Sequence, residues 1–528
     1  MKLPSVMGHQ FGANPRADIQ RSRFDRSSGL KTTFDSGYLV PIFADEALPG
    51  DTFSLQSTMF CRLATPIVPI MDNIFLETFF FAVPVRLLWD NWKKFNGEQR
   101  NPSDPVDYLV PTIQAPASVG VAVGSLSDYI GIPTGIPDLK FSALWHRAYN
   151  LIWNEWFRDQ NLQDSIATNT GNGPDSYSDY TLKRRNKRPD YFTSCLPFPQ
   201  KGNSVQIPLG SQAPVRGISI RASPSWNGVD GTALHESGAN NWTVASSNGN
   251  RVTNGIYIRQ DATNLTYPNV YADLSAATAA NINTLRQAFQ IQRLLERNAR
   301  GGTRYTEILQ AHFGVVSPDS RLQRPEYLGG SSTRIQINAV AQTSPTSGSN
   351  ALGDLAAFGI AADRYHGFTK SFTEHMVIIG LANVRADLTY QQGLNRMFSR
   401  STKYDFYWPA LANIGEQAVL NKEIYAQGTT ADDNVFGYQE RWGEYRYKPS
   451  VITGKFRSTY STPLDMWHLS QKFTSLPTLN STFIEDNPPL SRAIAVPSEP
   501  QFILDAYFAL NCARPMPMWG IPGLIDHF

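Results

Sequence analysis

The sequence predicts an all-β protein, and three observations point to that class. Several segments alternate apolar and polar residues or form apolar runs rich in β-branched and aromatic side chains, as strands do. The 38 glycines and 35 prolines interrupt nearly every segment, so the elements should be short and their connections long. Only two segments show the spacing of an amphipathic helix. We therefore expect a β scaffold with a few short helices and long loop insertions.

Four segments carry the strand signals. Residues 36–43 and 74–85 are rich in β-branched and aromatic side chains, and Pro84 places the second at a strand end or edge. Residues 333–343 alternate Ile, Ile and Ala with Arg, Gln and Asn, which predicts a sheet with one wet face. The run at 376–384 is continuously apolar, so we expect this strand to be buried on both sides.

Two segments predict helices that connect the strands. Residues 138–160 repeat apolar side chains at spacings of three and four, after a possible cap at Asp138 or Ser142. Residues 281–302 do the same and stop at a Gly-Gly pair. Between the helices, residues 201–275 are dominated by Asn, Ser, Gly, Thr and Ala, which indicates a surface insertion. A flexible linker is the alternative for that stretch.

The length of 528 residues exceeds what one simple core supports, so we expect a core with large insertions or two domains. The expected parts are an extended basic N-terminal arm at 1–35, a first part of the core at 36–200 with the helical insertion near 138–160, a surface insertion at 201–275, and the remainder of the core with a C-terminal extended segment at 276–528.

The low content of charged residues and the high content of aromatic residues favour a protein with large interfaces. Charged residues make up 17% of the chain and aromatic residues 12%. This combination is typical of extensive protein–protein interfaces, although an ordinary β-rich protein with aromatic strands has it too. Two aromatic residues in the interrupted apolar stretch at 74–98, Trp89 and Trp92, are candidate inter-subunit contacts that would become dry only on assembly, or else part of the chain's own core.

The net charge of +2 is too small to indicate a nucleic-acid binder, but the cations are grouped. The arm and the segment 183–188 are the two candidate surfaces for a nucleic acid, whose phosphates need cations and whose bases can stack on aromatic rings. The candidate residues are Arg16, Arg21, Arg23, Arg26 and Lys31 in the arm, and Lys183, Arg184, Arg185, Lys187 and Arg188 in the second group. A solvated loop or a salt-bridged patch is an equal alternative for the second group.

Several function classes lack their sequence signals. No window is apolar enough to span a membrane, and the first residues do not resemble a secretory signal, so we expect the chain to stay in the cytosol. We find no phosphate-binding loop, dinucleotide fingerprint, nucleophile elbow or His-Glu-x-x-His pair. Cys61, Cys195 and Cys512 lie far apart, which predicts reduced, buried thiols. We expect no enzyme, no cofactor and no metal.

Five long segments, in order along nearly the whole chain, are similar to the major capsid proteins of the Microviridae, within the gokushovirus branch. They include "RSRFDRSSGLKTTFDSGYLVPIFADEALPGDTF" from Arg21, "FFFAVPVRLLWDNWKKFNGE" from Phe79 and "PSEPQFILDAYFALNCARPMPMWGIPGLIDHF" from Pro497. The other two are "RAYNLIWNEWFRDQNL" from Arg147 and "HFGVVSPDSRLQRPEYLGG" from His312. The insertion at 201–275 does not match residue by residue.

The resemblance implies a viral jelly roll, an eight-stranded antiparallel β-sandwich whose loops carry much of the mass. It also implies a T=1 icosahedral virion shell of sixty copies, assembled in the host cytoplasm around circular single-stranded DNA that is held without regard to sequence. Expected partners are a small basic DNA-packaging protein, an internal scaffolding protein, a DNA pilot protein and an unknown host receptor. The insertion, with Trp226 and Trp242, is the candidate threefold protrusion for host attachment.

A competing hypothesis is a secreted β-rich carbohydrate-binding protein or glycosidase, suggested by the aromatic residues and neutral polar loops. It predicts a monomer with a cleft that holds separated carboxylates. The missing signal segment counts against it.

Overall fold

A computed structural model describes residues 20–205, 282–348 and 351–520, together with four two-residue strands between 215 and 272. The chain divides into two compact units. One combines Met1–Pro199 with Ala299–Phe528, and the other is Gln200–Asn298. The second unit contains β8 (Val215–Arg216), β9 (Ile218–Ser219), β10 (His235–Glu236), β11 (Tyr271–Ala272) and most of α5 (Ile282–Arg300).

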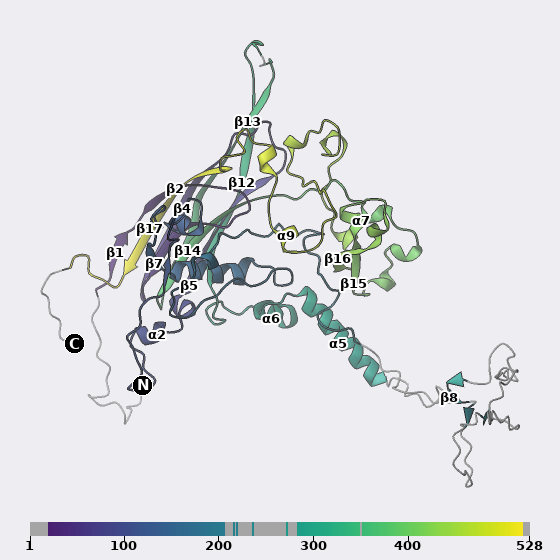
Figure 1. The fold of residues 1–528 in the computed structure, drawn as a ribbon, viewed down its shortest axis with the longest axis horizontal. Helices are drawn as coiled ribbons and strands as arrows, with labels where there is room; N and C mark the ends of the chain where they lie inside the picture. Colours follow the sequence, from purple (N-terminus) through teal and green to yellow (C-terminus); the bar gives the residue numbers. More distant parts are fainter. Residues whose placement is uncertain are drawn as a thin grey trace, which may run out of the picture. The chain divides into compact units, whose positions relative to one another are not determined.

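The first unit is built on one curled antiparallel sheet that forms a half-barrel (Figure 1). The all-β prediction is confirmed, and the curled sheet is consistent with a jelly-roll sandwich. Neighbouring strands along the sheet are β1 (Ser22–Asp25), β17 (Phe502–Arg514), β4 (Thr52–Leu63), β13 (Leu355–Ser371), β12 (Glu326–Ala341), β5 (Ile74–Pro84), β14 (Met376–Ala386) and β3 (Val40–Ala47), with β2 (Ser28–Phe34) also paired to β17.

The long strand β12 joins the two halves of the sandwich. Its residues 326–335 pair with β5, and its residues 336–341 pair with β13. We call β1, β2, β17, β4 and β13 the first half, and β5, β14 and β3 the second half. A bulge between Tyr327 and Gly329 interrupts the register of the part of β12 that pairs with β5.

The core lies between the inner faces of the two halves. The ring centroid of Phe80 on β5 lies 5.7 Å from that of Phe368 on β13 and 6.5 Å from that of Phe508 on β17. Phe43 on β3 also approaches Phe508, at 5.2 Å. Such tilted and edge-on pairs add to the burial of apolar area that holds the halves together. The alternating pattern of β4 and β17 places one face of each strand in this core.

The second half is covered on its outer face as well. Phe81, Val83 and Ile379 belong to a second apolar cluster, which Trp89, Tyr149 and other residues of the chain between β5 and β12 complete. Every residue of β14 is buried, so the prediction of a strand hidden on both sides is confirmed. Pro84 ends β5, as predicted. This covering chain contains α1 (Val85–Leu88), α2 (Trp92–Phe95), β6 (Thr112–Gln114), α3 (Leu126–Ile130), β7 (Lys140–Ser142) and α4 (Leu144–Ile152).

Both predicted helices exist, with one shifted start. The first begins at Leu144 and continues as a π-helical turn at Trp153–Phe157. It does not begin at Asp138 or Ser142, because Lys140–Ser142 forms a strand that pairs with β6. The second is α5, which ends before Gly301 and Gly302 as predicted.

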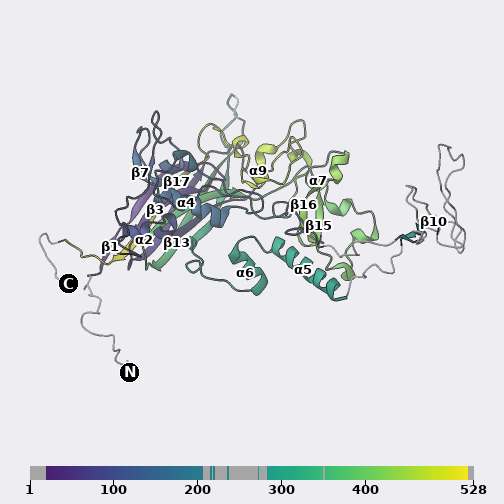
Figure 2. The ribbon, with the colours of Figure 1, turned by 60° about the horizontal axis from the view of Figure 1, so that its bottom comes forward.

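The connection between β14 and β17 forms a smaller apolar cluster together with residues 191–195. A hairpin of β15 (Glu416–Leu420) and β16 (Val435–Glu440) lies beside α7 (Asn421–Ile424) (Figure 2). Buried aromatic residues including Tyr191, Phe192 and Phe436 fill its interior. The remaining α-helices among the described residues of the first unit are α6 (Tyr305–Phe313), α8 (Gly443–Arg446) and α9 (Ser481–Ile484).

Candidate nucleic-acid interface

From residue 22 onward, the basic arm is part of the sheet. β1 and β2 follow each other along the same edge of β17 (Figure 1). The Arg21 guanidinium donates a hydrogen bond to the Thr52 hydroxyl at 2.5 Å, and Arg23 donates to Oδ1 of Asn511 at 3.2 Å. Both arginines remain exposed. The sheet therefore presents these two cations at fixed positions, while Arg16 lies outside the residues that the structure describes.

Lys31 on β2 is an open cation of the arm. Its side chain is 83% exposed and lies 3.5 Å from Asp505, which is itself 59% exposed. An ion pair this open is worth little, because water screens both charges. Lys31 is therefore available to a phosphate.

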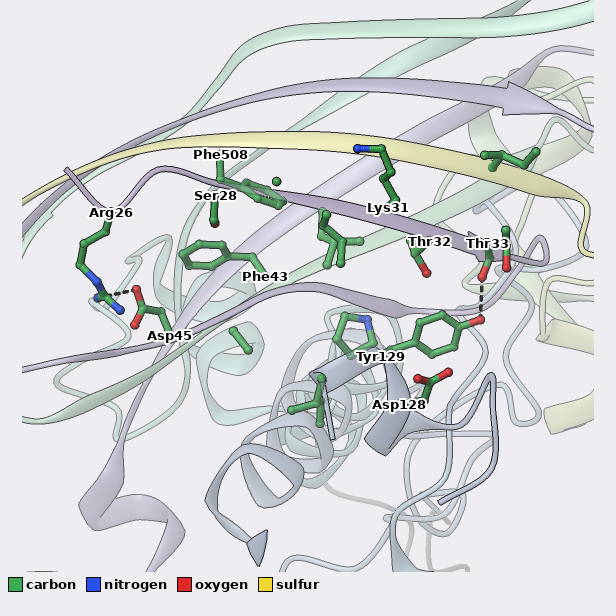
Figure 3. A pocket seen from close by; sticks show the side chains of 18 residues that line it. Arg26, Ser28, Lys31, Thr32, Thr33, Phe43, Asp45, Asp128, Tyr129 and Phe508 are labelled. Atoms are coloured by element: carbon green, nitrogen blue, oxygen red, sulfur yellow. Dashed lines mark hydrogen bonds and ion pairs between the residues drawn. The ribbon is translucent and has the colours of Figure 1, made fainter. Parts of the chain in front are cut away.

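Arg26 lies in a different place from the rest of the arm. The mouth of the half-barrel, between the edge strands β2 and β3, holds a cavity of about 670 Å³. Figure 3 shows Arg26 paired with Asp45 at one end of this mouth, and Tyr129 at the other end, where its hydroxyl donates to the Thr33 carbonyl. The Arg26–Asp45 distance is 2.7 Å. Arg26 is thus partly neutralised within the chain, and we place it last among the arm cations as a DNA contact.

Two more cations occupy the outer face of the first half. Arg62 on β4 and Arg364 on β13 are exposed; Arg62 lies between buried neighbours on its strand, and Arg364 follows the buried Asp363. Sequence reasoning missed both residues. The signal was present in "TFSLQSTMFCRL" at 52–63, whose strict alternation marks a strand with one wet face.

The segment 183–188 lies in an interior charge network instead of an open surface. Glu77 on β5 is buried, and it accepts hydrogen bonds from Arg185, from Arg188 at 3.0 Å and from Arg385 on β14 at 2.8 Å. Burial favours the neutral carboxyl, but the three guanidinium groups outweigh it and lower the pKa of Glu77. Glu77 is the partner that sequence reasoning missed, because it lies 108 residues from Arg185.

Two other cations of this segment, Arg184 and Lys187, are also engaged within the chain. Arg184 stacks on Tyr38 with its Cζ 4.0 Å from the ring centroid, and it donates to the Asp486 carbonyl at 3.0 Å. Lys187 donates to the Phe483 carbonyl at 2.6 Å, and burial lowers its pKa to about 8. Burial also lowers the pKa of Lys183. We therefore keep the arm, and not 183–188, as the candidate DNA-facing surface.

Trp89 corrects one expectation. Its side chain is 0% exposed in the single chain, and its indole N–H donates to Oδ1 of Asn172 at 2.8 Å. The prediction that Trp89 becomes dry only on assembly is therefore wrong, because the chain between β5 and β12 folds back over it. Trp92 lies on the same cluster and is only partly buried, so a contact of Trp92 with a neighbouring subunit stays a prediction.

Metal binding and membrane spanning have no counterpart among the described residues. Within them, no group of three or more His, Cys, Asp or Glu side chains could hold a metal ion. The three cysteines are free and buried, as predicted. No helix in the described part of the chain has the length and apolar character needed to cross a membrane. Trp226 and Trp242 lie outside the described residues.

Comparison with known proteins agrees with these features. The model of a family described as capsid protein (F protein) matches residues 13–524. A protein called capsid protein VP1 from Bdellovibrio phage phiMH2K is 48% identical and covers 100% of both chains. Proteins of the same name from Chlamydia phage 1 and Spiroplasma virus 4 are 46% and 37% identical, with 99% and 98% of this chain covered and 99% and 97% of theirs.

Proposed function

This chain belongs to the capsid protein (F protein) family of the Microviridae phages, and from that premise we propose that sixty copies build a T=1 shell around a circular single-stranded DNA genome. As a capsid protein, the chain assembles with its own copies into a shell and is part of the virion. Membership of a structural family also argues against the glycosidase hypothesis.

One observation supports the DNA-facing part of this proposal. Arg21, Arg23 and Lys31 are exposed at one edge of the sheet, beside the bare outer face of the first half. The outer face of the second half is covered by the chain between β5 and β12. We propose that the bare face lines the inside of the shell, where its cations neutralise phosphates regardless of base sequence.

The low net charge predicts that other proteins supply part of the positive charge that neutralises the genome. At +2 per chain, the shell carries far too little charge to neutralise a packaged genome. A small basic DNA-packaging protein is therefore a proposed partner, together with an internal scaffolding protein and a DNA pilot protein. Assembly in the host cytoplasm is proposed with them. We also propose that the insertion at 201–275, including Trp226 and Trp242, attaches to the host, and that Trp92 contacts a neighbouring subunit.

Electron microscopy of particles tests this function directly. The proposal predicts closed shells of megadalton size, where a chain that acts alone would stay a 58.8 kDa monomer. In the triple variant Arg21→Glu, Arg23→Glu and Lys31→Glu, we expect shells at normal yield but fewer DNA-filled shells relative to empty ones. Arg100→Glu, which reverses an exposed cation elsewhere, is the matched control. An unchanged ratio in the triple variant would reject the arm as a DNA contact.

A further inference from the structure

The outer face of the first half carries large apolar side chains in the open. Phe60 on β4 is 46% exposed, Tyr507 on β17 is 53% exposed, and Ile503 on β17 is 56% exposed. Their strand neighbours point into the core, so the exposure follows from the alternation and not from a distorted strand. Large apolar side chains grouped on one exposed face mark a binding surface.

The strand register places cations among these side chains. Three rows cross the face from β17 through β4 to β13. The middle row, given first, holds Asp505 with Phe60 and Ala362; the rows on either side of it hold Tyr507 with Thr58 and Arg364, and Ile503 with Arg62 and Ile360. Lys31 on β2 extends the first row, opposite Asp505. Successive rows are two residues apart along a strand, about 7 Å, so Arg62 on β4 and Arg364 on β13 each lie one row from Phe60, on opposite sides of it.

We propose that this face is a stacking platform for the bases of single-stranded DNA. Phe60 and Tyr507 contact the faces of bases, while Arg62 and Arg364 neutralise the adjoining phosphates. The inference rests on the proposed function and deepens it, because the arm cations explain attraction to any polyanion but not a preference for unpaired bases. Every base has a face that can stack, so the platform accepts any sequence, whereas a duplex keeps its bases inside.

The charge of the face favours nucleic acid over a second copy of the chain. In the three rows and Lys31, the cations are Lys31, Arg62 and Arg364, and the one carboxylate is Asp505, which lies beside Lys31. Two such faces placed against each other would bring cations opposite cations, which repel. A strand with one negative charge per nucleotide is complementary to the face instead.

Binding measurements on the full-length chain before assembly test the platform. Oligothymidylate and an abasic strand of the same length carry the same charge, but only oligothymidylate can stack. We expect Phe60→Leu and Tyr507→Leu each to lower affinity for oligothymidylate roughly tenfold and to leave affinity for the abasic strand unchanged. Leucine keeps an apolar side chain on the strand, so the sheet should fold as before.

Three further variants serve as controls. Phe60→Trp keeps an aromatic ring and should retain affinity for oligothymidylate. Tyr404→Leu removes a ring that is 59% exposed but lies away from this face, and it should bind as the unsubstituted chain does. Arg62→Gln should weaken binding to both strands alike and reduce the dependence of log affinity on log salt by about one.

The outcomes separate the platform from the proposed function. No preference of the unsubstituted chain for oligothymidylate over the abasic strand would overturn the platform, and so would unchanged affinity in both leucine variants. Loss of shells in Phe60→Leu with unchanged DNA affinity would assign the face to a second copy and would also overturn it. If the unsubstituted chain builds no DNA-filled shells, the proposed function itself fails.

Discussion

Two basic segments of this chain look alike in sequence and differ in the folded protein. The arm cations Arg21, Arg23 and Lys31 lie on an exposed sheet edge, with partners that are themselves exposed or neutral. The segment 183–188 instead packs against the outer side of β5, where Arg185 and Arg188 share the buried carboxylate of Glu77. Positive charge is thus open to an external ligand in one place and is paired inside the protein in the other.

The difference shows that a cluster of cations indicates a nucleic-acid site only when the cations do not share a buried carboxylate. Removing a buried cation from water is costly unless it is paired, so the fold supplies Glu77 to 183–188. At the exposed edge there is no such cost, and the arm needs no partner. Removing one charge from the network at 183–188 should therefore lower the stability of the fold, whereas removing one charge from the arm should weaken DNA binding.

The largest expected effect is the loss of the buried carboxylate. Glu77→Gln leaves Arg185, Arg188 and Arg385 without their shared negative charge, and breaking a buried pair costs about 3–5 kcal/mol. Urea or thermal unfolding of the purified chain measures this loss. Asp505→Asn, which removes the exposed partner of Lys31, is the matched control, and it should change the free energy of unfolding by less than about 1 kcal/mol. Equal losses of unfolding free energy in the two variants would contradict the difference between the buried and the exposed ion pairs.

Single arginine substitutions should have smaller effects, on stability in one segment and on DNA binding in the other. Arg185→Gln should lower the free energy of unfolding by about 2 kcal/mol and leave the DNA content of particles unchanged, because its guanidinium is bonded to Glu77. Arg23→Gln should change stability by no more than about 0.5 kcal/mol and reduce the salt dependence of DNA binding by about one in log–log slope. Unfolding curves and salt titrations check the two results. Reduced DNA content in Arg185→Gln with normal stability would contradict the interior role.

The smallest expected effect concerns pH. Burial raises the pKa of the Asp486 carboxyl to about 6, although four nearby cations lower it. The folded protein therefore holds this proton more tightly than the unfolded chain does, whose carboxyl has the ordinary value of 3.8. The penalty of the buried charge is full above about pH 6 and disappears as the pH falls towards 4.

Asp486→Asn removes that titration. We expect the unsubstituted chain to gain stability relative to the variant when the pH is lowered from 7 to 5, as measured by urea unfolding at each pH. A stability difference that does not change with pH would show that Asp486 is not buried as a charge among these cations.

Much of the fold could be predicted from sequence because its signals are local. The apolar run of β14 and the position of Pro84 gave the strands of the second half, and three- and four-residue spacing gave α4 and α5. The start of α4 could not be predicted, because β7 forms only by pairing with β6. The alternation at 52–63 indicates a strand with one solvent-exposed face, but sequence reasoning did not use it.

The candidate site was less predictable, because partners come from distant parts of the chain. The exposed state of Lys31 depends on β17, and the neutralised state of Arg185 depends on β5. Trp89 was misjudged for the same reason, since Asn172 and the covering chain hide it. Composition indicated interfaces and charge grouping indicated DNA, but only the fold distinguishes an exposed cation from a paired one.

A reconstruction of DNA-filled particles by electron cryo-microscopy tests the central claim most directly. We predict nucleic-acid density on the inner wall of the shell against β17 and β4, within contact distance of Lys31 and Arg23, and residues 183–188 enclosed within the subunit. Particles in which this face points outward, or in which DNA density lies against 183–188 and not against the arm, would contradict the account.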